Sequence, residues 1–167
     1  LYGLDNEELG RIVKEKGLPA YRASQLADWV YKKHIASFSE AKNLAPALRE
    51  ALEKNHQLFT LRLMEVAESS NKESSKYLFR THDGQLIESV LITQQDRRTV
   101  CVSTQIGCKI GCIFCASGKG KFGRNLTPGE IVEQVAWVER RLKSTQVRHC
   151  DPPRSLAEKQ SVLTKDC

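Results

Sequence analysis

The chain has 167 residues, with 26 lysines and arginines against 20 aspartates and glutamates, and its formal net charge is +6. Hydrophobic residues make up 40% and charged residues 28%, which excludes a collagen-like, wholly disordered or low-complexity protein. The length allows one domain, or a small module joined to part of another. No apolar run approaches the roughly 20 residues of a membrane-spanning helix, so we expect no membrane partner.

The first third of the chain predicts a helical module over residues 1–57. Asp5 and Glu8 form a capping-box pattern, and an apolar stripe at helical spacing follows before Gly17. Two more helices are expected over residues 21–33 and 45–55. Basic side chains along these helices could contact RNA, although each one alone is more typical of an ordinary solvated helix face.

Residues 58–96 predict strands that form a β-hairpin. Alternation over residues 60–66 and short runs at 76–81 and 85–92 indicate three strands, and Asp83-Gly84 is a strong turn signal. Residues 99–103 are short and apolar enough for a buried parallel strand. Thr127 and Pro128 then begin a helix that should continue through Leu142. The pattern therefore predicts an α/β protein.

The cysteines fall into two groups. Cys101, Cys108, Cys112 and Cys115 lie within 15 residues, whereas the other two are Cys150 and Cys167. A secreted disulfide scaffold would spread its cysteines over the chain to connect distant segments. Clustered thiols without a secretion signal indicate metal binding or redox chemistry, so we expect a reducing, cytoplasmic location.

Basic residues surround the cysteine cluster. Six bases and no acid lie between residues 97 and 129. A positive surface around a reactive centre suits a polyanionic substrate such as RNA. A solvated basic loop would have the same composition, so the charge alone does not decide between the two.

The segment from Cys108 through Cys112 to Cys115 carries three thiols at spacings that suit an iron–sulfur cluster. A four-iron cluster with three cysteine ligands leaves one iron open to a small molecule. The alternative is a structural zinc ion, which needs four ligands and could take Cys101 as the fourth.

Together with its flanks, this segment resembles the RlmN/Cfr family of radical S-adenosylmethionine enzymes, which are dual-specificity adenine methyltransferases of ribosomal and transfer RNA. The aromatic Phe114 before the last cysteine fits the superfamily signature. The flanks 19–26, 76–80, 85–92, 101–108, 124–127 and 130–135 are similar to the family's segments. The RlmN type, which methylates carbon 2 of adenine, is favoured over the Cfr type, which acts at carbon 8.

The resemblance implies a role for each matched residue. Cys108, Cys112 and Cys115 would bind a 4Fe-4S cluster, and S-adenosylmethionine would bind its open iron. Glu88 would be the proton acceptor, and Cys101 would resolve the protein–RNA adduct through a transient disulfide. The implied partners are 23S ribosomal RNA, transfer RNA and an electron donor such as flavodoxin or ferredoxin, and we expect a monomer.

Each assignment has a plainer alternative. Glu88 could simply be a solvent-facing hairpin residue, and Cys101 could be a small buried residue on a strand. A non-catalytic, zinc-binding module that interacts with RNA is the alternative for the whole chain.

The fold that the resemblance implies is a helical module and β-hairpin followed by the start of a partial (β/α) barrel, over residues 97–143. Residues 144–167 do not resemble the family, whose members are longer and carry a Gly-Glu motif and a methyl-carrying cysteine further on. The sequence therefore predicts a chain that is truncated after the first barrel helix. Either it is a fragment of a longer protein, or the reading frame shifts near Ser144 and the tail is read out of frame, which is the favoured alternative. We expect this chain to be inactive alone.

Overall fold

The computed structural model describes residues 1–110, 112–115 and 121–150, the last six of these as backbone alone. Its helices and strands are α1 (Asn6–Glu15), α2 (Tyr21–Ala27), the π-helical turn η1 (Asp28–Lys33), the 3-10 turn η2 (Phe38–Glu40), α3 (Pro46–Asn55), β1 (Arg62–Glu68), β2 (Ser74–Arg80), β3 (Leu86–Gln94), β4 (Arg97–Cys101) and α5 (Pro128–Cys150). Within the described ranges, no helix is both long and apolar enough to cross a membrane.

Helices α1, α2 and α3 form the helical module expected from the sequence. The capping box at the start of α1 is present: the Glu8 amide donates to Asp5 at 2.8 Å, and the Asp5 amide donates to the Glu8 carboxylate at 2.9 Å. Leu9 and Val13 are fully buried, as the helical stripe predicts. The module therefore has its own apolar core.

The helix expected over residues 21–33 changes its winding part of the way along. It is α-helical only to Ala27 and continues as the π-helical turn η1, which ends at His34 in the left-handed region with φ 54°. The Ile35 amide then donates to the Trp29 carbonyl oxygen at 3.3 Å. The apolar spacing did not reveal this change, because Leu26 and Val30, four residues apart, are both fully buried as a continuous helix would require.

The described strands form one antiparallel sheet in the order β1-β2-β3-β4. The prediction of a buried parallel strand over residues 99–103 was wrong. Strand β4 begins at Arg97, pairs antiparallel with β3, and is mostly exposed. Only Gln95 and Asp96 connect the two strands, and a parallel pairing would need a much longer crossover.

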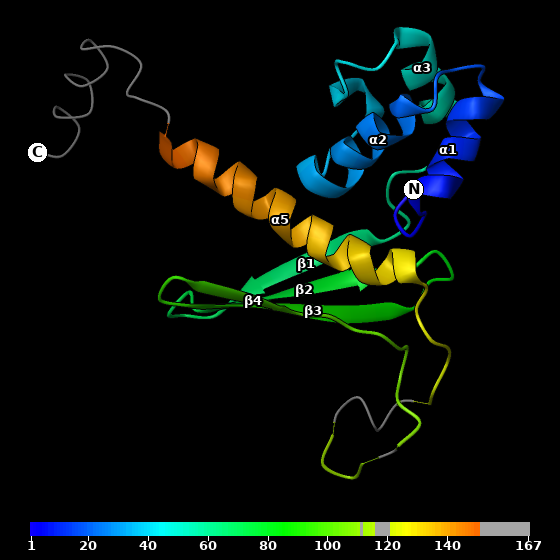
Figure 1. Cartoon of the computed structure of the whole chain (residues 1–167). Helices are drawn as coiled ribbons and strands as arrows, with labels where there is room; N and C mark the ends of the chain where they lie inside the picture. Colours follow the sequence, from blue (N-terminus) through cyan, green and yellow to red (C-terminus); the bar gives the residue numbers. More distant parts are fainter. Residues whose placement is uncertain (111, 116–120, 151–167) are drawn as a thin grey trace, which may run out of the picture.

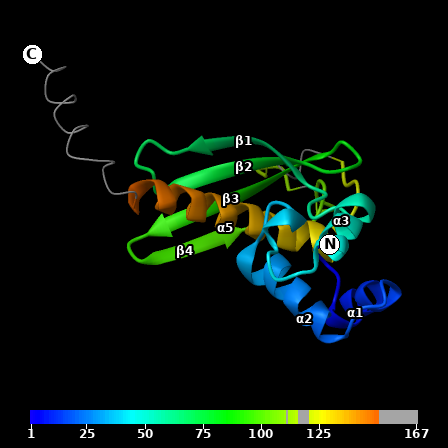
Figure 2. The ribbon, with the colours of Figure 1, turned by 90° about the horizontal axis from the view of Figure 1, so that it is seen from above.

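Helix α5 lies between the helical module and the sheet (Figures 1 and 2). Ala136 belongs to the core of the module, while Val138 belongs to the core between α5 and the sheet. The helix runs on to Cys150 rather than ending near Leu142, so the predicted boundary at residue 144 falls inside a helix. Residues 151–167 of the predicted tail lie outside the described residues.

Two adjacent buried polar side chains attach α5 to its neighbours. The Glu133 carboxylate accepts from the Thr60 amide at 2.8 Å, the Leu61 amide at 2.7 Å and the Thr60 hydroxyl at 3.0 Å. Burial raises the pKa of Glu133, and these hydrogen bonds act against that shift. Glu133 thus connects α5 to the segment that leads from the module into β1.

Gln134 makes the second attachment, on the sheet side. Its side-chain oxygen accepts from the Ser89 hydroxyl at 2.6 Å and the Ser103 amide at 2.8 Å. Its side-chain nitrogen donates to the carbonyl oxygens of Ser103 at 2.9 Å and Glu130 at 3.1 Å. All four hydrogen-bonding positions of the amide are used, as a buried amide requires.

The N-terminal segment crosses the first turn of α5 at two glycines. A Cβ on Gly129 would lie 2.4 Å from the Tyr2 carbonyl oxygen, and a Cβ on Gly3 would lie 2.7 Å from the Gly129 nitrogen. Gly3 also has φ 92°, where L-residues are strained. The close contact between module and α5 therefore depends on these glycines.

We predict that Gly129→Ala lowers the free energy of unfolding by about 1–3 kcal/mol, because the added methyl group would overlap backbone atoms. Gly10→Ala is the matched control: nothing lies within 4 Å of its Cβ position on α1. It should raise stability by about 0.5–1 kcal/mol. Denaturant unfolding of both variants checks this, and equal effects would contradict the close packing.

Candidate functional site

Glu88 and Cys101 lie on the face of the sheet that points away from α5. Neighbouring β3 residues such as Ser89 face α5, and side chains alternate along a strand. Cys101 pairs with Val90, which is two residues from Glu88 and on the same face. Both Glu88 and Cys101 are exposed, so the alternative of Cys101 as a buried strand residue is wrong.

A pocket of about 620 Å³ opens on this face. It is lined by residues from the sheet and from the segment after β4, namely Leu78, Leu86, Ile87, Glu88, Val102, Ser103, Thr104, Gln105, Gly107 and Cys108. The pocket thus brings Glu88 together with the first cysteine of the loop. Its volume is in the range of small-molecule sites.

The cysteine loop leaves the body of the protein through a narrow neck. The Ile106 amide donates to the Arg124 carbonyl oxygen at 2.9 Å, and the Gly123 amide donates back to Ile106 at 2.8 Å. Gly107 has φ 69°, and a Cβ there would lie 2.2 Å from the Lys121 carbonyl oxygen. The two ends of the loop are therefore held together like a short hairpin.

Arg124 fixes this neck to the sheet and to α5. Its guanidinium donates to both Glu130 carboxylate oxygens, at 2.7 and 2.8 Å, and to both Asp83 oxygens, at 2.9 and 3.1 Å. Hydrogen bonds from Arg124 lower the pKa of Asp83 and of Glu130. The Glu130 carboxylate also accepts from the Thr127 amide at 2.8 Å, which completes the cap of α5.

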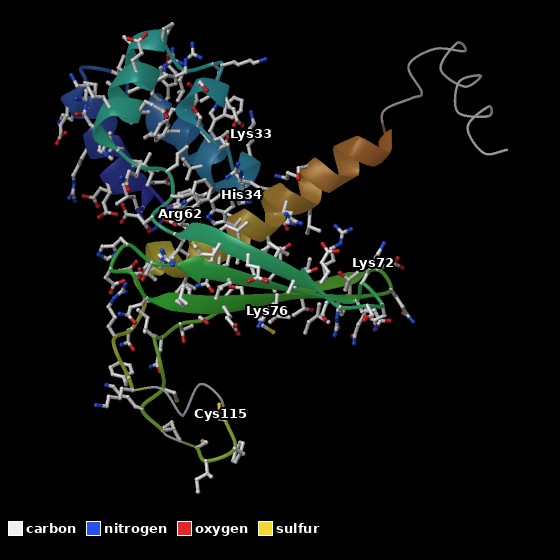
Figure 3. All side chains as sticks on the ribbon, turned by 180° about the vertical axis from the view of Figure 1, so that it is seen from behind. Lys33, His34, Arg62, Lys72, Lys76 and Cys115 are labelled. Carbon is white, nitrogen blue, oxygen red and sulfur yellow. The ribbon has the colours of Figure 1, made fainter. Side chains whose placement is uncertain are left out.

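The loop extends beyond the sheet on the side away from α5, and Cys115 lies on this extension (Figures 1 and 3). Cys108, Cys112 and Cys115 are half-buried free thiols, and the Cys115 amide donates to the Cys112 carbonyl oxygen at 3.1 Å. Ile113 and Phe114 between them are 94% and 92% exposed. Among the described residues, no three ligating side chains are gathered closely enough to hold a metal ion.

The donor set nevertheless fits an iron–sulfur cluster. Three thiols follow one another on a single loop, and Cys101, Cys108, Cys112 and Cys115 are all free. Thiolates are the ligands that iron–sulfur clusters prefer. Cys101 is also free, but it lies on the sheet face rather than on the loop.

Two contacts hold Glu88 in place, one through its side chain and one through its backbone. The Glu88 carboxylate lies 3.0 Å from the Lys76 ammonium of the neighbouring strand. The backbone carbonyl oxygen of Glu88 accepts from the Ser103 hydroxyl at 2.7 Å. Glu88 is therefore solvent-exposed, as the plainer alternative holds, and it also lines the pocket.

Sequence reasoning missed the residues that support the site. In the sequence, Arg124 stands out only as one of six bases and as part of a flanking segment, and its partner Asp83 only as a turn residue. Gln134 was not singled out at all. The one signal in the sequence for Gln134 is that a polar residue stands on the side of the predicted helix that carries the apolar, buried residues.

The chain is similar to a described protein family and to several named proteins. Residues 1–58 match the family model described as the ribosomal RNA large subunit methyltransferase N-terminal domain. The chain is 44% identical over 150 residues to the dual-specificity RNA methyltransferase RlmN of Sulfurovum sp. strain NBC37-1, covering 82% of this chain and 40% of that protein. A probable dual-specificity RNA methyltransferase RlmN of Bacillus velezensis is 43% identical over 148 residues, covering 89% of this chain and 40% of that protein.

A solved structure is also similar. The radical SAM methyltransferase from Sphaerobacter thermophilus has a TM-score of 0.81 and 40% identity, over 87% of this chain and 43% of that one. The chain thus spans about two fifths of the length of the relatives it matches. These matches confirm the resemblance inferred from the cysteine segment and its flanks.

We predict that Arg124→Gln lowers the free energy of unfolding by about 1–3 kcal/mol, because it leaves the buried Glu130 carboxylate without its partner. Arg11→Gln is the matched control, since its pair with Glu7 is well exposed on α1. That control should cost less than about 0.5 kcal/mol. If thermal unfolding shows the two variants to be alike, Arg124 is not an anchor.

The same anchor should make stability depend on acid. The pKa values of Asp83 and Glu130 lie below their ordinary values of 3.8 and 4.5 in the folded chain. Their contribution is therefore complete above about pH 4.5 and is lost as the pH falls through the lowered values. The Tm difference between the parent chain and Arg124→Gln should shrink in that range. A constant difference down to strong acid would contradict this assignment.

Proposed function

Because the chain is related to the RlmN methyltransferases, we propose that it is part of a radical S-adenosylmethionine enzyme that methylates carbon 2 of adenine in 23S ribosomal RNA and in transfer RNA. The observation that carries this proposal is the pocket in which Glu88 and Cys108 meet. The chain spans about 40% of its curated relatives, so the activity is proposed for the whole protein. We expect these 167 residues alone to be inactive.

Cys108, Cys112 and Cys115 would hold a 4Fe-4S cluster, and S-adenosylmethionine would bind beside it. When bound, these groups supply the radical chemistry that methylation of an unreactive ring carbon requires. The loop leaves the sheet on the side away from α5 (Figure 3), and its first cysteine, Cys108, lines the same pocket as Glu88. The neck and Arg124 hold the ends of that loop against the body of the protein.

Glu88 would accept the proton from the adenine carbon that gains the methyl group. An exposed carboxylate on the pocket wall is free to reach a bound base, and the Lys76 contact keeps it on that face. A positioned general base contributes typically 100- to 10,000-fold to a rate. Cys101, exposed on the same face, would help to resolve the protein–RNA adduct by forming a transient disulfide with the methyl-carrying cysteine of the whole protein.

The Sulfurovum and Bacillus relatives carry the name RNA methyltransferase, and the acid-free stretch around the loop suits an RNA substrate. A soluble electron donor such as flavodoxin or ferredoxin would supply electrons, and we expect a monomer. The Cfr type, acting at carbon 8, is the alternative within the family. The methylated position in the product adenosine distinguishes the two.

Anaerobic reconstitution with iron and sulfide tests the ligand set. We predict a brown, oxygen-sensitive chain with about four iron and four sulfide atoms. Replacing any one of Cys108, Cys112 or Cys115 by Ala should abolish the colour, whereas Cys101→Ala should keep it. A colourless chain that binds one zinc ion, and loses it in Cys101→Ala, would support the structural zinc module instead.

Activity of the whole, reconstituted protein tests the proton acceptor. Glu88→Gln should lower kcat by roughly 100- to 10,000-fold while leaving the cluster content unchanged. Glu65→Gln is a matched control, because Glu65 is an exposed acid on the same face and in the same row of the sheet. Similar rates for Glu88→Gln and the parent enzyme would rule out this role.

A further inference from the structure

Two arginines stand directly opposite each other on the open face of the sheet. Arg62 begins β1 and Arg80 ends β2, and the two are paired in the antiparallel register. Side chains opposite each other in such a pair have Cβ atoms roughly 5 Å apart. Two positive charges therefore share one small area of the surface.

This pair lacks a counter-charge within the part of the chain that the structure describes. Neither arginine makes a hydrogen bond, an ion pair or a ring contact there, and both are exposed. Like charges directly opposite each other destabilise a sheet. The unmatched pair is thus a cost to the fold that an anion could remove.

The pair lies beside the pocket. Arg80 pairs on its other side with Leu86, which lines the pocket, and the next row of the same face carries Glu88. The turn that follows Arg80 contains Asp83, the partner of Arg124 at the neck of the cysteine loop. The arginines are therefore at the same end of the sheet as the loop.

The nearest acids on this face do not form ion pairs with the two arginines. Glu65 is the acid in the adjoining row on β1, but it lies more than 4 Å from every cation in the described residues. Glu88 in the same row is already paired with Lys76 at 3.0 Å. The guanidinium donors of Arg62 and Arg80 thus remain available at the pocket edge.

We propose that Arg62 and Arg80 form a phosphate clamp that binds the RNA backbone next to the nucleotide whose base enters the pocket. This rests on the proposed RNA substrate and adds a positioning site that the cysteine loop and Glu88 do not supply. A guanidinium binds phosphate with two parallel hydrogen bonds, and two such groups side by side can grip adjacent phosphates or one from both sides. Binding there would fix the register of the RNA relative to Glu88.

The test measures RNA binding by the 167-residue chain at about 50 to 200 mM salt, with a labelled synthetic RNA hairpin that has an unpaired adenosine in its loop. The double variant Arg62→Gln/Arg80→Gln should bind roughly tenfold more weakly. The slope of log affinity against log salt concentration should become less steep by about 2. Lys72→Gln is the matched control: it removes one exposed positive charge from the far end of the same β1–β2 hairpin and should leave both quantities unchanged.

Two further measurements separate a clamp from a structural role. The double Gln variant should melt at or above the temperature of the parent chain, because opposed like charges are removed. The variant Arg62→Lys/Arg80→Lys keeps both positive charges but loses the two parallel N–H donors of each guanidinium. It should therefore bind the RNA several-fold more weakly, with nearly the same salt dependence.

A double Gln variant with the affinity and slope of the parent chain would overturn the clamp, as would a parent chain that does not bind the hairpin. Either result would leave the iron–sulfur assignment unaffected. Conversely, failure to assemble the cluster, with arginine-dependent RNA binding intact, would overturn the proposed methyltransferase and leave the clamp in place.

Discussion

The arrangement of the whole molecule depends on two neighbouring polar side chains buried on α5. Glu133 binds the backbone of the segment that enters β1, and Gln134 binds Ser89 of β3 and both backbone groups of Ser103. Buried polar groups are costly unless their hydrogen bonds are made, so these contacts specify one position for the helix rather than many. The module, the sheet and the start of the cysteine loop are thereby placed relative to a single element.

This placement leaves the opposite face of the sheet free for chemistry. Because α5 covers one face, Glu88 and Cys101 are directed to the other, where the cysteine loop also lies. The protein holds the ends of that loop firmly, through the neck and the bidentate contacts of Arg124. In contrast to these ends, Ile113 and Phe114 within the loop are almost fully exposed to solvent. A scaffold of this kind fixes where the thiols emerge.

Much of the fold could be predicted from the sequence because its signals are local. The capping box at Asp5, the turn at Asp83-Gly84 and the Thr127-Pro128 start of α5 each act through adjacent residues. The cysteine spacing was likewise sufficient to identify the candidate cluster loop and, with its flanks, the family. Glu88 and Cys101 were found through the resemblance and not from the pattern of residues.

What the sequence did not reveal depends on contacts between distant residues or on small changes of geometry. The antiparallel β4 was mistaken for a parallel strand because Arg97 and Arg98 obscured its start, and its short connection to β3 was overlooked. The Arg124–Asp83 contact spans 41 residues, and no spacing rule predicts such a pair. The opposed arginines become visible only once the strand register is known.

An anaerobic crystal structure of the chain reconstituted with iron and sulfide would show directly which sulfur atoms hold the metal. We expect a cluster bound by the sulfur atoms of Cys108, Cys112 and Cys115 only, on the face of the sheet that carries Glu88, with Arg124 still joined to Asp83 and Glu130. A metal ion bound by four protein sulfur atoms, that of Cys101 among them, would contradict this ligand set.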